Sequence, residues 1–556
     1  MMGVNEQTLS IGCGPAAQES AAQTEVIGFK AYNLWRIARL GLPVPPAFVL
    51  GTEFCHEYFR RGRETPDGLR EVLTAKIRHI EQASGLVFGG ARKPLLVSVR
   101  SGAPVSMPGM LETVLDVGLN DQTLRGLVRT TGNPRGAWDS YRRLVQSFAE
   151  IVHRCPTGEF EAICAEHLRL CGLEQVSEMD FQQLATLTNA YQHLFEDRTG
   201  AAFPQNPIEQ LEAAVAAVWE SWSSSKAVEY RRLNDLSDHL GTAVTVQRMV
   251  FGNAGGASGS GVGFTRDPST GENRLYLDFV FNVQGEDVVS GRIDAADTAL
   301  LVDAFPETYK EIVTVARTLE REFRDLQEFE YTVENGHLFI LQTRSGKRTP
   351  WAALRIATEL VTEGIIDAGE ALQRLGAIDL DGIQRTRIES VDDQRVLCRA
   401  TAASCGVASG CIALDSESAQ AMANQGRQAI LVRETTSTAD IAGIAAAAGI
   451  LTAVGGRTSH AAVVARQMNK VCLVCCDALS VDLEHRRCSI GDTVFNEGAV
   501  ISLDGDSGQV ISGEAKVVVE KPLAWLAEVA RWRREAVPPF PAVSDLASRP
   551  PLSRTE

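Results

Sequence analysis

The sequence predicts an α/β protein of several domains. At 556 residues the chain is too long for one hydrophobic core, so we expect three to five compact units. Short strand-like runs alternate with helical patterns up to about residue 115, and strand patterns return near residue 243. Residues 116–235, between them, follow a helical period and are rich in Leu, Glu and Ala. These observations predict α/β units with a helical subdomain between them.

The composition favours a cytoplasmic protein whose main partner is neither a nucleic acid nor a membrane. Seventy acidic residues against 54 basic ones give a net charge of −16, which disfavours binding to a polyanion. The N-terminus lacks the pattern of a signal peptide, and no apolar run is long enough to span a bilayer. Because the net charge is negative, any phosphate site must depend on a local group of basic residues.

The cysteines indicate reduced thiols. Twelve of them are scattered over a long chain, which is not the pattern of a disulfide framework. Cys472, Cys475 and Cys476 lie close together and leave a metal site open, but they fall in an apolar run. A buried strand with thiols as small hydrophobic groups is the favoured interpretation.

The first α/β part is predicted at residues 24–115, after a polar and loose segment at 1–23. Gly28-Phe29-Lys30 precedes an amphipathic helix, which the sequence Gly-Leu-Pro-Val-Pro-Pro ends before a strand at Phe48–Leu50. A further strand, Leu95–Val99, leads into Arg100. Lys30 and Arg100 could supply the positive charge that a triphosphate needs.

The second α/β part is predicted at residues 236–345. A strand at Ala243–Val250 is followed at once by a glycine-rich stretch, residues 252–263. Its unblocked N–H groups would suit a polyphosphate, although a flexible turn explains the glycines equally well. Two further strand patterns, 275–283 and 329–344, complete this part.

The predicted hairpin whose second strand ends at Arg344 offers oxygen ligands for a metal. Glu328 and Glu330 lie on one face of the preceding strand. If the turn at Asn335-Gly336 has three residues, Glu328 faces Gln342, and two carboxylates and one amide oxygen converge as Mg²⁺ prefers. A two-residue turn would put Gln342 on the opposite face, so the register stays open.

The last predicted unit, residues 395–515, carries one histidine in a distinctive setting. A helical, charged connector at 346–394 precedes this unit, and a proline-rich mobile tail is expected at 516–556. Gly455-Gly456 predicts a turn, Thr458 or Ser459 can cap a helix, and His460 falls in its first turn. There the helix dipole favours an anion and disfavours a charged imidazole. A lone histidine could also simply pack or cap.

Motifs along the chain, in this order, resemble those of the pyruvate phosphate dikinase family. They are GFKAYNL (28–34), GLPVPPAF (41–48), SVRSGA (98–103), VSMPGMLETVLDVGLND (105–121), VQRMVFGN (246–253), GVGFTRDPSTGE (261–272), NVQGEDVVSG (282–291), LQTRSGKRT (341–349) and ILTAVGGRTSHAAVVARQMNK (450–470). The resemblance implies an ATP-grasp fold, split across 24–115 and 236–345 around the helical subdomain. It also implies that a swivelling β/β/α phosphohistidine domain follows, with ATP and Mg²⁺ as cofactors.

The resemblance also implies roles for individual residues. The catalytic set is His460, Arg344 and Thr458, and Thr458 matches a regulatory threonine of some plant relatives. Glu330 and Gln342 match metal-side residues. The nucleotide-side positions are Lys30, Arg100, Gln247, Met249, Val250, Asp278, Gln284, Glu286 and Glu328. Glu328 stands where the family usually has Asp, and Asp278 where it often has Glu. Arg457 replaces a common apolar residue, and Gly255-Gly256-Ala257 replaces a more acidic loop.

The implied reaction converts ATP and inorganic phosphate into AMP, pyrophosphate and phospho-His460. The MPGM and QTRSGKRT motifs favour this dikinase branch over the synthase branch, which uses water. Full-length members continue into a barrel that binds pyruvate or phosphoenolpyruvate, and a barrel needs roughly 250 residues. We therefore expect the phosphoryl acceptor on another chain, for which a separate barrel subunit is a candidate. The oligomeric state stays open, a homo-oligomer included.

Two other functions remain open at this point. Some relatives phosphorylate a small molecule such as an antibiotic, and the helical segment 120–235 is the only spare volume for its acceptor site. A non-catalytic regulatory or assembly partner would keep the fold without the reaction. Delivery from His460 would require the connector at 345–395 to let its domain turn, since one histidine cannot occupy two distant sites in a rigid molecule.

Overall fold

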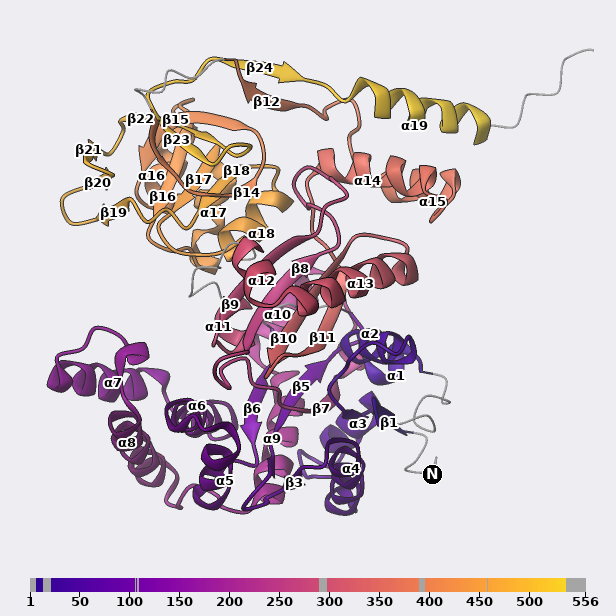
Figure 1. Ribbon diagram of the computed structural model, residues 1–556, viewed down its shortest axis with the longest axis vertical. Helices are drawn as coiled ribbons and strands as arrows, with labels where there is room; N and C mark the ends of the chain where they lie inside the picture. The colour runs from indigo at the N-terminus through magenta and orange to yellow at the C-terminus, as the bar shows by residue number, and fades with distance from the viewer. Residues whose placement is uncertain are drawn as a thin grey trace, which may run out of the picture. The chain divides into compact units, whose positions relative to one another are not determined.

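The computed structural model describes residues 7–13, 22–105, 107, 110–289, 298–389, 396–457 and 459–536 (Figure 1). The chain forms two compact units. Unit 1 comprises Met1–Gly263, Leu277–Ala316 and Glu328–Ser345, and unit 2 comprises Phe264–Tyr276, Arg317–Gln327 and Gly346–Glu556. None of the helices within these described ranges is both long and apolar enough to cross a membrane.

A five-stranded sheet in unit 1 joins segments that are far apart in the sequence. Its order is β1 (Thr8–Ile11), β2 (Ala47–Leu50), β7 (Ala243–Arg248), β5 (Val97–Gly102) and β6 (Thr113–Val117). β7 pairs antiparallel with β2 on one side and β5 on the other. The strand that opens the second α/β part therefore lies in the middle of the first. β1 lies in the segment expected to be loose, and it is paired with β2, so that expectation is wrong for these four residues.

Helices cover this sheet and form the helical region. They are α1 (Thr24–Ile27), α2 (Phe29–Arg39), α3 (Thr52–Arg60), α4 (Leu69–Ser84), α5 (Asp121–Thr131), α6 (Pro134–Val152), α7 (Thr157–Cys171), α8 (Phe181–Thr199), α9 (Pro207–Ser221) and α10 (Ser225–Leu233). Asn120, Asn133, Asp180 and Asn206 accept N–H bonds at the starts of α5, α6, α8 and α9. One continuous apolar core runs from the sheet into these helices.

A second sheet contains half of the glycine-rich stretch. Its order is β11 (His337–Ser345), β10 (Gln327–Glu334), β8 (Gly259–Phe264) and β9 (Tyr276–Phe281). A Cβ at Gly259, Gly261 or Gly263 would come within 2.2, 2.5 or 2.4 Å of the rings of Phe279, Tyr331 and Phe329. These three glycines therefore make room for aromatic rings in an inner strand. The phosphate-cradle interpretation is wrong for them and stays open only for residues 252–258. The helices that follow are α11 (Gly285–Val289), α12 (Thr298–Ala304) and α13 (Pro306–Phe323).

The hairpin between β10 and β11 has a two-residue turn. Asn335 and Gly336 have φ angles of 50° and 79°, which is the left-handed geometry of a type I′ turn. The three-residue turn used to place Gln342 is therefore wrong.

Unit 2 contains an eight-stranded sheet that carries His460. Its order is β13 (Val396–Arg399), β23 (Gln509–Ser512), β22 (Val500–Asp504), β15 (Val407–Ala413), β16 (Ala429–Arg433), β17 (Gly449–Thr452), β18 (Val471–Val474) and β14 (Thr401–Ser404). β15 to β18 are parallel, and the crossovers hold α16 (Ser416–Asn424), α17 (Ile441–Ala446) and α18 (His460–Gln467). Buried side chains alternate along β16 between two apolar clusters: Leu431 lies in one, and Ile430 and Val432 in the other. A small sheet of β19 (Leu479–Asp482), β20 (Arg487–Ile490) and β21 (Thr493–Asn496) completes the domain.

Unit 2 also orders part of the segment expected to be a mobile tail. β24 (Val517–Glu520) pairs with β12 (Arg385–Ile388), and α19 (Leu523–Ala536) follows. α19 packs against α14 (Pro350–Thr362) and α15 (Ala368–Leu375), as Figure 1 shows, with Trp351 and Trp525 in edge-to-face contact at 5.4 Å. The expectation of a tail from 516 is therefore wrong for residues 517–536. The prolines beyond them lie outside the described residues.

Candidate active site

Three cationic side chains and two carboxylates gather in unit 1. They come from α2 (Lys30), β5 (Arg100), β10 (Glu328 and Glu330) and β11 (Arg344). Burial lowers the pKa of Lys30 most strongly; the nearby Arg100 and Arg344 lower it too, while Glu330 raises it. Lys30 still has solvent-accessible surface. An exposed ammonium group close to two arginines and a glutamate is available to an anionic ligand.

Arg344 lies between the two glutamates. It forms an ion pair with Glu328, whose side chain is nearly buried. Burial lowers the pKa of Arg344, but Glu328 and Glu330 outweigh it and the net shift is upward. Gln342 is two residues from Arg344 on β11, so the two side chains leave the strand on the same face. The two-residue turn sets Glu328 opposite Thr343, whose hydroxyl donates to Glu328 O at 3.2 Å, so the placement of Gln342 beside the glutamates stays a prediction.

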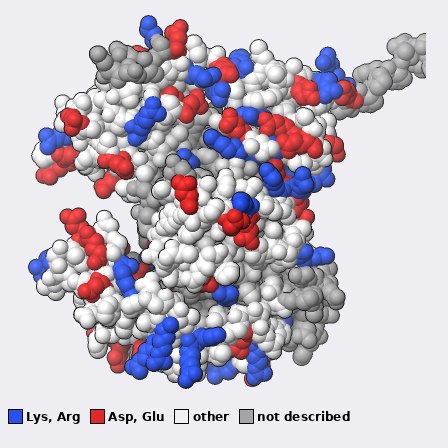
Figure 2. Space-filling view, viewed as in Figure 1, with Lys and Arg blue, Asp and Glu red and all other residues white. Residues whose placement is uncertain are grey.

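Arg100 keeps an unused donor in this cluster. Its Nε is buried and has no hydrogen-bond partner. A buried donor without a partner carries a desolvation cost that an anionic ligand would remove. Three cations against two carboxylates leave a positive excess here, on a chain with a net charge of −16. On the face that Figure 2 shows, acidic and basic side chains are interspersed.

The residues predicted to surround the nucleotide base lie at the end of β7 and directly after it. Gln247 is buried, and its Nε2 donates to the carbonyl oxygen of Pro45 at 3.4 Å. The N–H of Met249 donates to Leu96 O at 2.8 Å, and the side chains of Met249 and Val250 are buried. These residues offer an apolar wall next to β5. Asp278 is also buried, on β9, and its carbonyl oxygen accepts from the Tyr331 hydroxyl at 3.4 Å.

Side chains already occupy part of the remaining glycine loop. The Gly252 N–H donates to Gln284 Oε1 at 3.0 Å, and the Gly255 N–H donates to Asn282 Oδ1 at 3.2 Å. Gln284 therefore holds the loop in place. A Cβ at Gly256 would meet nothing within 4 Å, so this end of the loop is open. Glu286 lies on α11, and its side chain is outside the described atoms.

His460 is the first residue of α18 in unit 2. Ser459 caps the helix, with its Oγ accepting from the Ala462 N–H at 3.5 Å. The imidazole is half-buried, and its Nδ1 lies 3.5 Å from the Thr436 hydroxyl. Burial lowers the pKa of His460 and Asp440 raises it, with a net downward shift. The ring is therefore neutral near pH 7 and keeps a lone pair for nucleophilic attack. Thr458 lies outside the described residues.

A metal would have to use few protein ligands. Among the described residues no three His, Cys, Asp or Glu side chains form a group that could hold an ion. Glu330 and Gln342 remain as hard oxygen donors, because Arg344 engages Glu328. Magnesium commonly takes one or two protein oxygens and completes its shell with water and substrate phosphates, so this donor set fits it.

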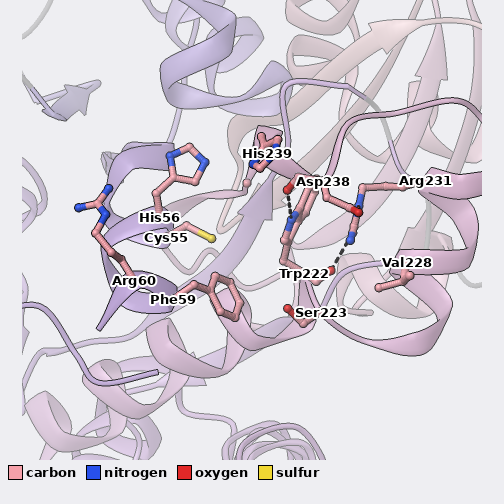
Figure 3. A pocket seen from close by; sticks show the side chains of 11 residues that line it. Cys55, His56, Phe59, Arg60, Trp222, Ser223, Val228, Arg231, Asp238 and His239 are labelled. Atoms are coloured by element: carbon pink, nitrogen blue, oxygen red, sulfur yellow. Dashed lines mark hydrogen bonds and ion pairs between the residues drawn. The ribbon is translucent and has the colours of Figure 1, made fainter. Parts of the chain in front are cut away.

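A separate pocket of about 680 Å³ lies elsewhere in unit 1 (Figure 3). Its lining residues include Cys55, His56, Phe59, Trp222 and Arg231. Arg231 stacks on the Trp222 ring at 4.1 Å, and the indole N–H donates to Asp238 O, so that wall is fixed by its own contacts. None of the predicted site residues lines it.

Comparison with known proteins identifies both parts of the chain. Residues 61–305 match the model of the pyruvate phosphate dikinase AMP/ATP-binding domain, and residues 426–508 match that of the mobile domain of PEP-utilising enzymes. The first match contains Arg100, and the second contains His460. The fold and the two matches define a protein with an AMP/ATP-binding domain followed by a mobile domain of the PEP-utilising type.

Several similar proteins are named pyruvate, phosphate dikinase. The chain is 40% identical to the pyruvate, phosphate dikinase of Rhizobium meliloti (strain 1021), over 94% of this chain and 60% of that protein. It is 41% identical to that of Clostridium symbiosum, over 89% and 57%, and 42% identical to pyruvate, phosphate dikinase 2 of Zea mays, over 88% and 56%. Both parts of the chain are therefore similar to members of the pyruvate phosphate dikinase family. It spans about 60% of the length of these relatives or less.

Sequence reasoning missed two buried arginines of unit 2, Arg266 and Arg466, both of which have no exposed surface. Arg466 stands among small apolar residues in HAAVVARQ. Its place near the end of a short helix made it look like an exposed, helix-ending charge, so the sequence offered no signal of its burial.

Proposed function

We propose that this chain is an ATP- and Mg²⁺-dependent phosphotransferase that phosphorylates its own His460. The observation that carries the proposal is the cluster of Lys30, Arg100 and Arg344 with Glu328 and Glu330. Three cations, one of which carries a buried donor without a partner, suit a polyphosphate. The matched AMP/ATP-binding domain supports ATP as that polyphosphate. The His460 domain supplies a neutral imidazole at a helix N-terminus, where a phosphoryl group is stabilised.

The proposed chemistry has two balanced steps. The His460 imidazole attacks the β-phosphorus of ATP, the bond from that phosphorus to the α–β bridging oxygen breaks, and AMP leaves. Inorganic phosphate then takes the terminal phosphoryl group, so pyrophosphate leaves and phospho-His460 remains. Lys30, Arg100 and Arg344 would bind the phosphate oxygens and offset the charge that develops on the transferring group.

Glu330 and Gln342 would hold Mg²⁺ on the phosphates, where the ion supplies further charge neutralisation. Glu328 acts on Arg344 in this proposal and keeps its guanidinium directed toward the site. Gln247, Met249 and Val250 would bind the base, with Asp278, Gln284 and Glu286 nearby on the nucleotide side. Thr458 remains a predicted catalytic or regulated residue.

We further propose that phospho-His460 passes its phosphoryl group to an acceptor held by another chain. The names of the relatives point to pyruvate as that acceptor, and a barrel subunit that binds it is our first candidate. The antibiotic-like and non-catalytic alternatives have no observation in their favour. A cytoplasmic location is part of this proposal, since ATP and phosphate are abundant there.

The proposal is tested by the products of a single turnover. The protein is mixed with ATP, Mg²⁺ and inorganic phosphate without an acceptor, and AMP and pyrophosphate are measured. We expect about one equivalent of each per chain, because the phosphorylated histidine cannot turn over. His460→Ala should form neither product while still binding ATP. Steady release of ADP, or equal product from His460→Ala, would contradict the proposal.

A further inference from the structure

Arg466 is a completely buried cation in the helix that begins with His460. Its exposed fraction is 0%. The Nη1 group donates to Arg457 O at 2.8 Å and to Ala403 O at 3.0 Å. Its Nε and Nη2 are buried without hydrogen-bond partners. Among the described residues, no carboxylate forms an ion pair with it. Arg466 therefore ties the loop before His460 to strand β14 through backbone carbonyls alone.

One of these carbonyls, that of Ala403, also accepts a hydrogen bond from a second segment of the chain. Residues 264–276, which we name the β8–β9 connection, run from the end of β8 to the start of β9. The hydroxyl of Ser269 donates to Ala403 O at 3.0 Å, and that of Tyr276 donates to Ala402 O at 3.2 Å. Ala403 O is thus shared by Arg466 and the β8–β9 connection.

Aromatic rings of the β8–β9 connection also cover the two arginines of this region. The Phe264 ring lies 5.5 Å from the Arg466 guanidinium, and the Tyr276 ring lies 4.8 Å from that of Arg457. Such cation–π contacts are favourable once the cation is desolvated. The β8–β9 connection therefore contributes to the burial of Arg466, and Arg466 in turn holds the Arg457 carbonyl in the loop before His460.

The energetic balance of this contact is close. Burying a guanidinium with two unbonded donors and no carboxylate is costly. Hydroxyl bonds to Ala402 and Ala403 and two ring contacts offset the cost while the β8–β9 connection is in place. If the connection moved away, water would reach Nε and Nη2. The contact can thus hold the His460 domain and yet be broken without leaving a buried charge behind.

We propose that Arg466 is a positioning residue that couples the His460 loop to docking of its domain on the β8–β9 connection. This inference rests on the proposed function for its effect on phosphorylation. In the docked arrangement, Arg466 holds the carbonyl of Arg457 and so fixes the backbone that presents His460. When the domain leaves the connection, the guanidinium becomes hydrated and its grip on that backbone weakens.

The first test uses hydrogen exchange, which requires no activity. In Arg466→Met the side chain fills the same space but donates no bond, so we expect faster exchange of the amides of residues 455–462. Arg466→Lys restores one donor and should recover part of the protection. The matched control is Arg427→Met, which removes a cation of the same domain away from the loop. Protection unchanged in Arg466→Met would overturn the inference.

The second test measures the rate at which ATP loads His460. We expect Arg466→Met to slow loading roughly ten- to hundredfold through misplacement of the nucleophile, with the KM for ATP unchanged. If the methionine variant does not fold, Tyr276→Phe is used, which removes the hydroxyl bond to Ala402 O and should raise exchange in the His460 loop more modestly. Normal loading with normal protection in the folded variant would contradict the inference.

The two tests separate this inference from the proposed function. A wild-type protein that accepts no phosphoryl group, but whose loop loses protection in Arg466→Met, would sink the proposed function and leave the positioning role standing. Normal loading and normal protection in both Arg466 variants would sink the positioning role and leave the function standing.

Discussion

Two arginines of unit 2 are equally buried but are compensated in opposite ways. Arg266 has no exposed surface and bonds three carboxylates: Glu320 at 2.8 and 3.0 Å, Glu359 at 2.8 Å and Glu363 at 2.6 Å. Arg466 is buried to the same degree and bonds only two carbonyl oxygens, with two donors unused. The first charge is neutralised within the fold, and the second is not.

This difference distinguishes a contact that stays formed, that of Arg266, from a contact that can break, that of Arg466. Arg266 links the β8–β9 connection to α13, through Glu320, and to the region of α14, through Glu359 and Glu363. Removing that link would leave the nearly buried Glu320 without its arginine and would take one partner from Glu359 and Glu363, so these parts stay together. Arg466 has nothing comparable to lose, because water can replace its partners. We infer that the base of unit 2 is rigid and that the contact of the His460 domain with the connection is the breakable one.

The largest effect on stability is expected from removing the ion pairs of Arg266. Arg266→Met should lower the free energy of unfolding by about 3 kcal/mol or more, because the nearly buried carboxylate of Glu320 loses its partner. Denaturant unfolding of the variant measures it, with Arg274→Met, an exposed position on the same connection, as the control. A loss as small as that of the control would show that the two buried arginines are equivalent after all.

A third environment for cations sharpens the comparison: Arg344 is paired with Glu328, and we propose the phosphates of ATP as the partners of Lys30 and Arg100. Lys30→Met and Arg100→Met should each weaken ATP binding about tenfold or more, which is about 1.4 kcal/mol or more. Protein stability should stay the same or rise, because a desolvated like charge is removed. Calorimetric titration with Mg·ATP checks the affinity, and Arg36→Met, on the same helix as Lys30, serves as control. Unchanged affinity would remove these residues from the site.

A smaller effect is expected at the breakable contact. Ser269→Ala deletes one hydroxyl bond to Ala403 O, which is worth about 1 kcal/mol. Global unfolding should change little, while exchange of the amides near His460 should become faster. Loss of global stability as large as in Arg266→Met would mean that this contact belongs to the permanent core.

The smallest expected effect is a shift in pH dependence. The pKa of His460 is lowered below its ordinary value of 6.5, so the unfolded chain binds a proton there before the folded chain does. Its contribution to stability is therefore complete above pH 6.5 and is lost as the pH falls through the lowered pKa. The rate at which ATP loads His460 should fall over the same pH range, since only the neutral ring is a nucleophile. We call this falling part of the pH profile its acidic limb.

Asp440→Asn removes the group that raises this pKa, so the limb of the loading profile should move to lower pH. Asp477→Asn, an exposed carboxylate of the same domain, is the matched control. A shift to higher pH would show that Asp440 acts on His460 in another way than through its charge.

Much of this arrangement could be predicted from the sequence, and the failures have physical causes. Lys30, Arg100, Glu328, Glu330 and Arg344 could be predicted as a group because the helix and the strands that carry them are short and strongly patterned. The glycines of β8 were misread because composition does not show which rings pack above a strand. β24 and α19 were missed because pairing with β12 and packing on α14 are long-range contacts. Arg466 was missed because burial of a charge depends on the β8–β9 connection, almost two hundred residues earlier in the sequence.

The central claim is that ATP loads His460 through its β-phosphoryl group. The most direct measurement incubates the protein with ATP labelled in either the β or the γ phosphorus, in the presence of inorganic phosphate, and maps the labelled peptide. We predict acid-labile label from the β position only, on the peptide that contains His460, and none in His460→Ala. Label from the γ position alone, or label that persists in His460→Ala, would contradict the account.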